Sequence, residues 1–139
     1  MISLFIDTAS SNLIIYLLKD NEVLSYVNKR ANTEMSVHFF PELETIFNEA
    51  NIKPVEVDKI FIVTGPGSFT GVRIGLTFAK LFALLMNKNL IPISSLELLA
   101  TTNLDCDYIC SIVDARRGYV YAGMYDQQLN PVIVDQYIK

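Results

Sequence analysis

The chain has 139 residues, of which 51% are hydrophobic, enough to build the core of one ordinary domain or of two small lobes. Its formal net charge of −4 provides no overall basic field, so we expect any role with nucleic acid to be indirect. Asp7 interrupts the first apolar stretch, and we find neither a secretory signal nor an apolar run long enough to span a membrane, which predicts a cytoplasmic protein.

The N-terminal part predicts an antiparallel meander of three strands followed by a helix. The strands are predicted at residues 2–7, 12–18 and 22–28. Apolar side chains then recur at helical spacing from Thr33 to Ala50, and Pro41 is expected either to kink this helix or to mark the start of its regular part.

The central part predicts a buried strand, a glycine-rich loop and a second helix. The apolar run 59–64 is typical of a buried strand, and the loop VTGPGSFTGVRIG follows at 63–75. The helix is expected to begin near Thr70 and to run to about Asn87. Because this helix is apolar almost all round, one side must lie on a sheet and another must be covered by the 33–50 helix or by a second protein chain.

The C-terminal part predicts a short strand, a short helix and then three more strands. The spacing of Ser94 and Glu97 is that of a capping box, which would open a helix through about Thr102 after a strand at 90–93. The last strands are predicted at 108–113, 119–125 and 132–138. The sequence therefore predicts a first lobe at 1–103 and the beginning of a second, apparently incomplete lobe at 104–139.

The glycine-rich loop matches neither of the two common phosphate-binding patterns. A P-loop needs a glycine followed by a lysine, with that glycine at the sixth position of the motif. The sixth position is Thr70 when counted from Gly65 and Val72 when counted from Gly67. A dinucleotide fingerprint starting at Gly65 needs a glycine where Thr70 stands. Two interpretations remain open at this stage. The loop can be an anion-favouring nest at the start of a helix, or a tight strand-to-helix turn that permits close packing.

Few other residues suggest chemistry. Asp7, at the end of the first strand, could hold the water shell of a Mg²⁺ ion or bond only to its local turn. His38 is the only histidine, so a two-histidine zinc site within this sequence is excluded. The Asp114-Ala115-Arg116-Arg117-Gly118 turn could contact a phosphate or form a solvated hairpin. Cys106 and Cys110 are expected to be inert, buried thiols.

Five spaced segments together resemble the TsaB family. These are IDT at 6–8, HFFP at 38–41, GPGSFTGVRIG at 65–75, SSLE at 94–97 and DARRGYVYA at 114–122. TsaB is the bacterial partner subunit for making threonylcarbamoyladenosine at adenosine 37 of tRNA. The resemblance implies an α/β, actin-like and Hsp70-like ATPase fold of the ribonuclease H-like kind, with a mixed sheet flanked by helices.

The resemblance also implies a non-catalytic scaffold that pairs with the catalytic subunit TsaD and works with the ATPase TsaE. ATP or ADP and Mg²⁺ would be used by the assembled complex, and tRNA would meet this subunit only indirectly. The enzymatic relatives carry two metal-binding histidines where this sequence has only His38, so we expect metal and transfer chemistry to belong to the partner. No glycine follows Asp7 directly, which predicts a weak or vestigial nucleotide site. Its residues would be Asp7, Thr8, Gly65, Gly67, Ser68, Gly71 and Arg116.

Docking is expected to occur through the two apolar helices. The predicted contact residues are Phe39, Leu43, Phe47, Val72, Leu76 and Lys80. The same helices are expected to form a homodimer when no partner is present. The alternative is an active sugar-type or acetate-type kinase of the same superfamily, with Asp7 and Asp114 as candidate carboxylates.

Overall fold

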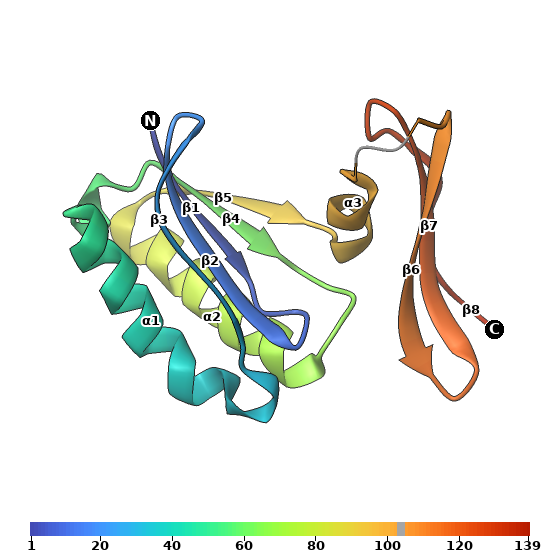
Figure 1. Ribbon diagram of the computed structural model, residues 1–139, viewed down its shortest axis with the longest axis horizontal. Helices are drawn as coiled ribbons and strands as arrows, with labels where there is room; N and C mark the ends of the chain where they lie inside the picture. Colours follow the sequence, from blue (N-terminus) through green and yellow to red (C-terminus); the bar gives the residue numbers. More distant parts are fainter. Residues whose placement is uncertain (103–104) are drawn as a thin grey trace.

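The computed structural model describes residues 1–102 and 105–139, which form two sheets (Figure 1). The first has five strands in the order β3-β2-β1-β4-β5. They are β1 (Ile2–Asp7), β2 (Asn12–Lys19), β3 (Glu22–Arg30), β4 (Lys59–Val63) and β5 (Asn89–Ile93). β1, β2 and β3 pair antiparallel, whereas β4 pairs parallel with both β1 and β5. The predicted meander and the mixed sheet are thus confirmed.

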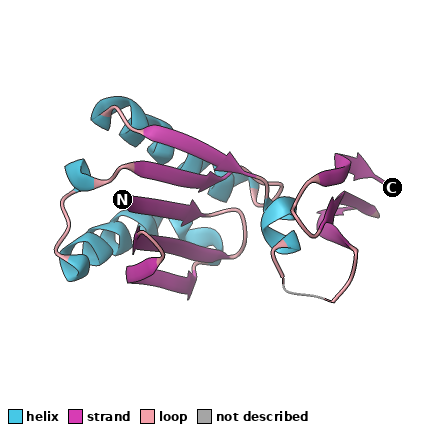
Figure 2. Ribbon diagram, turned by 90° about the horizontal axis from the view of Figure 1, so that it is seen from above, coloured by secondary structure: helices cyan, strands magenta, loops and turns pink. Residues whose placement is uncertain are grey.

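Two long helices pack on one face of this sheet. α1 (Met35–Ala50) follows a short 3₁₀ turn (Asn32–Glu34) and lies on β2 and β3. A second 3₁₀ turn (Pro54–Glu56) leads into β4, and α2 (Phe69–Met86) lies on β4, β1 and β5 (Figures 1 and 2). Their buried side chains and those of alternate strand residues form one core, so both helices cover the same face.

The helix boundaries follow from local chemistry. Each helix ends at an asparagine in the left-handed conformation, Asn51 at φ 53° and Asn87 at φ 51°, which asparagine tolerates better than most residues. α1 begins at Met35 and continues through Pro41, so the expectation that Pro41 marks the start of the regular part is wrong. Pro41 is the seventh residue of α1, beyond the four N–H groups that lack an intrahelical partner, so it removes the bond that an N–H there would donate to the carbonyl of Val37, and the helix continues on either side of it.

The second sheet is a three-stranded antiparallel meander. It consists of β6 (Tyr108–Arg116), β7 (Tyr119–Asp126) and β8 (Pro131–Ile138) in that order. The short helix α3 (Ser95–Ala100), which directly follows β5, packs on β6 and β7 with Leu96, Ala100 and Tyr125 at the centre of the contact. α3 therefore links the two sheets. The predicted lobe boundary stays a prediction, because part of it falls on residues 103 and 104, outside the described residues.

Ser94 caps α3, but without the predicted capping box. Its hydroxyl oxygen accepts from the N–H of Leu96 at 3.1 Å, and its O–H donates to the carboxylate of Asp135 on β8. The hydroxyl of Tyr125 donates to the same carboxylate, and burial together with this bond raises the pKa of Tyr125 to about 12. The structure thus shows a contact of Ser94 with Asp135 on β8 in place of the predicted capping box with Glu97.

Two further predictions need correction. α2 is long and apolar enough to cross a membrane by length and composition, contrary to the expectation that no segment is, but one side of it belongs to the core of the first sheet. Cys110 is exposed and Cys106 half-buried, so the expectation of buried thiols is wrong. Cys110 lies on the face of β6 opposite to Ile109, which packs toward α3.

Candidate functional site

The glycine-rich loop packs directly against the turn that follows β1. A β-carbon added to Gly67 would lie 2.2 Å from the carbonyl oxygen of Ala9, and one added to Gly71 would lie 2.0 Å from the carbonyl oxygen of Thr8. Both distances are far shorter than van der Waals contact. These glycines are therefore required by contact with the chain's own backbone.

Hydrogen bonds join the same two segments. The Ser68 N–H donates to the Ala9 carbonyl at 2.7 Å, and the Gly71 N–H donates to the Ser68 hydroxyl at 3.2 Å. The fully buried hydroxyl of Thr8 donates to the Gly71 carbonyl at 2.6 Å. Two N–H groups at the start of α2, which a phosphate would need, are consequently already bonded within the chain.

Asp7 is buried beside this contact. One carboxylate oxygen accepts from the Ala9 N–H at 2.8 Å, as in a local turn. Burial raises the pKa of Asp7, an effect that this hydrogen bond partly offsets. A carboxylate that holds the water shell of Mg²⁺ must be ionised and open to water, and Asp7 is 7% exposed.

The predicted nucleotide residues therefore divide into two sets. Asp7 and Gly67 line a cavity of about 150 Å³, and Arg116 lines a larger one of about 760 Å³ with Gly67 and Ser68. Thr8 and Gly71 bond to each other, and the carbonyl of Gly65 accepts from the N–H of Ser95 on α3. Residues in this state do not fit the phosphates and Mg²⁺ of a nucleotide, and the geometry gives the kinase alternative no support.

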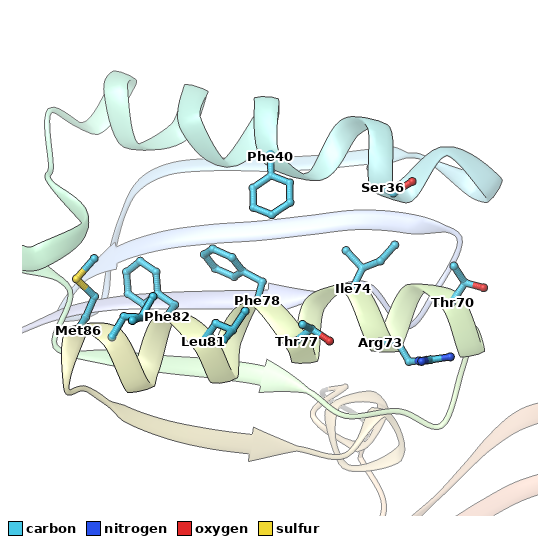
Figure 3. Close-up of a pocket in the computed structure, with 11 residues that line it drawn as sticks. Ser36, Phe40, Thr70, Arg73, Ile74, Thr77, Phe78, Leu81, Phe82 and Met86 are labelled. Atoms are coloured by element: carbon cyan, nitrogen blue, oxygen red, sulfur yellow. The ribbon is translucent and has the colours of Figure 1, made fainter.

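A different site lies between α1 and α2. The groove has a volume of about 640 Å³, and Figure 3 shows Phe40 reaching from α1 toward Phe78 on α2. The ring centres of Phe40 and Phe78 are 6.0 Å apart. The other lining residues are Ser36, Thr70, Arg73, Ile74, Thr77, Leu81, Phe82, Leu85 and Met86. Most of this surface is apolar.

Three of the predicted docking residues are misplaced. Phe39 is fully buried, while Leu43 and Phe47 are 7% and 6% exposed. They form the side of α1 that packs on the sheet, so they cannot reach a partner unless the helix moves. The helical spacing located the apolar stripe of α1 correctly, but the stripe belongs to the core.

The predicted docking residues on α2 lie nearer the surface. Val72 and Leu76 are half-buried and Lys80 is exposed. Sequence reasoning did not include several strongly exposed apolar residues of these helices in the docking surface, among them Phe40 at 60%, Leu84 at 77% and Leu85 at 76%. The sequence did contain a signal for them. Once one stripe of α2 is assigned to the core, the apolar residues left on the helix must lie on its exposed side.

Comparison with known proteins identifies a family model and several relatives that match this chain. A family model described as TsaD, tRNA N6-adenosine threonylcarbamoyltransferase, matches residues 26–139. The tRNA threonylcarbamoyladenosine biosynthesis protein TsaB of Bacillus subtilis (strain 168) is 38% identical over 98% of this chain. This chain belongs to the TsaB family. The TsaB of Escherichia coli (strain K12) is 28% identical over 93% of the chain.

The chain spans only part of these TsaB proteins, 61% of the Bacillus subtilis one and 57% of the Escherichia coli one. The structure titled YeaZ from Pseudomonas aeruginosa superposes with a TM-score of 0.86 at 24% identity, covering 99% of this chain and 67% of that one. The expected fold class, an α/β fold with a mixed sheet flanked by helices, is confirmed, and the YeaZ structure has the same fold.

Proposed function

We propose that this TsaB-family chain acts as a non-catalytic docking subunit in the synthesis of threonylcarbamoyladenosine in tRNA. The names of its relatives support the process, and the apolar groove between α1 and α2 supports the docking role. The catalytic partner would be a TsaD-like threonylcarbamoyltransferase, assisted by a TsaE-like ATPase. ATP or ADP and Mg²⁺ would act in the assembled complex and not on this chain.

The observation that carries the proposal is the exposure of large apolar side chains along one side of α2. Leu81, Leu84 and Leu85 are all more than half exposed, and Phe40 of α1 lies across the groove. A continuous apolar patch of this kind is uncommon on an isolated protein, and it marks a surface that another protein covers. Aromatic side chains such as Phe40 and Phe78 are the residue type enriched where partners anchor.

The test is to replace exposed groove residues with charged ones and to measure binding. Leu81→Glu with Leu85→Glu should abolish co-elution with the TsaD-like protein of the same organism, because two carboxylates would be desolvated in the interface. Val132→Glu with Val134→Glu is the matched control, since these side chains on β8 are 51% and 69% exposed.

Cells that depend on this gene provide the second measurement. The groove double variant should fail to restore threonylcarbamoyladenosine in tRNA, whereas the β8 double variant should restore it. Circular dichroism should show both variants folded. Full binding and full rescue by a folded groove variant would disprove the proposed surface.

A further inference from the structure

One of the four arginines of the sequence lines a cavity between the two sheets, and the other three lie next to residues of its lining. Arg116 lines this cavity of about 760 Å³, and Arg117 is the next residue in the same exposed turn. The Nε of Arg30 donates to the side chain of Asn32, a lining residue, at 3.1 Å. The guanidinium of Arg73 lies 5.1 Å from the ring centre of Phe69, which also lines the cavity. A chain of net charge −4 thus carries a local concentration of guanidinium groups.

Exposed aromatic rings accompany these arginines. Phe69, at the start of α2, is 76% exposed, and Tyr121 on β7 is 36% exposed; both line the cavity. The row of rings continues across the second sheet, because the ring of Tyr137 lies 5.3 Å from that of Tyr121 and stacks on Tyr119 at 4.9 Å with an angle of 4°. Several flat apolar surfaces are therefore open to stacking.

The rest of the lining consists largely of hydrogen-bonding groups. Its hydroxyl and amide side chains are Ser10, Ser11, Asn32, Thr33, Ser68 and Thr70. Asp114 is the acidic residue among the described residues of the lining, and one of its oxygens already accepts from the N–H of Arg116 at 2.8 Å. Little negative charge opposes an anionic ligand here.

We infer that this cavity and its aromatic row bind a single-stranded segment of RNA. Guanidinium groups suit the phosphates, and stacking on aromatic rings accepts any base. The arginines come from three places in the chain, which suits an extended strand better than a single compact nucleotide. The phosphate loop is filled by the chain's own backbone and leaves a free nucleotide without its usual anchor. This inference does not depend on the docking groove, and it replaces the expectation that RNA meets this chain only indirectly.

The experiment measures binding of the full chain to a fluorescent RNA hairpin with a single-stranded loop, by anisotropy at several salt concentrations. Arg116→Gln with Arg117→Gln should weaken binding by at least about tenfold and lower the salt slope by about 1.4, the value for two phosphate contacts on a single strand. Lys19→Gln with Lys53→Gln removes the same charge from two exposed sites elsewhere and should change neither quantity by as much.

The stacking surface is tested separately. Phe69→Ala should weaken binding by at least about fivefold and leave the salt slope unchanged, because it removes a ring and no charge. Tyr108→Ala is the control, since Tyr108 is 59% exposed and lies outside the lining. A blunt duplex of the same stem should bind more weakly than the hairpin.

Four results would overturn the inference. They are absence of hairpin binding by the unaltered chain, equal losses in the arginine and lysine variants, equal affinity for hairpin and duplex, and displacement of the hairpin by AMP or by polyglutamate at matched phosphate or carboxylate concentration. Displacement by AMP would assign the cavity to a free nucleotide, and displacement by polyglutamate would assign it to an acidic peptide.

Discussion

Replacing Gly71 with alanine should destabilise the fold in the absence of any ligand. The new β-carbon would lie 2.0 Å from the Thr8 carbonyl oxygen, so β1 and α2 must separate by more than an ångström. Overpacking of this kind costs about 1–3 kcal/mol. Weakening the hydrogen bond from Thr8 to the Gly71 carbonyl adds about 1 kcal/mol. The better helix propensity of alanine returns about 1 kcal/mol, leaving a net loss of about 1–3 kcal/mol.

The assay is urea unfolding of the full chain, followed by circular dichroism without nucleotide. Gly118→Ala is the comparison, because nothing lies within 4 Å of its β-carbon position and only its φ of +79° is unfavourable. That strain should cost about 1 kcal/mol. If Gly71→Ala unfolds at the same urea concentration as the unaltered chain, or a higher one, the close packing is not what requires glycine there.

Three further predictions concern titration and assembly. Because burial raises the pKa of Asp7, the folded chain should lose stability as the pH rises from 3.8 through the raised value. Asp7→Asn should therefore be more stable than the unaltered chain at neutral pH but not below pH 3.8. Equal urea midpoints of the two chains at neutral pH would contradict this. Tyrosinate absorbance should show Tyr125 ionising near its pKa of about 12, so stability should fall as the pH rises from 10 toward 12, and Tyr125→Phe should remove that late component. Light scattering should show a homodimer for the isolated chain and a monomer for Leu81→Glu with Leu85→Glu, and a monomer before substitution would refute self-association through the groove.

The order and type of the elements could be predicted from the sequence because each has a strong local signal. The apolar runs at 2–7 and 12–18 and the helical spacing from Met35 to Phe47 predict strands and a helix where the structure has them. Asn51 and Asn87, at the ends of the long helices, match a known stop signal that the sequence reading did not use.

The candidate site could be predicted only in part, because its geometry depends on contacts between distant segments. The pattern of α1 shows that Phe39 and Phe47 share a face, but not that this face lies on β2 and β3. Likewise, the glycines of 65–75 indicate that another part of the chain packs closely on this loop, but not which part. The structure identifies it as the backbone of Thr8 and Ala9, sixty residues or so earlier in the chain.

The contacts between the turn at Thr8 and the first turn of α2 also fix the direction in which that helix leaves the sheet. A hydroxyl bond, a backbone bond and two glycine contacts hold the start of α2, which supplies most of the groove lining. The wall of the groove is thus preorganised, and a partner need not order it upon binding, which lowers the entropic cost of association. A rigid wall also rejects shapes that do not match it. The loop, which packs against the chain's own backbone, would then contribute to the choice of partner.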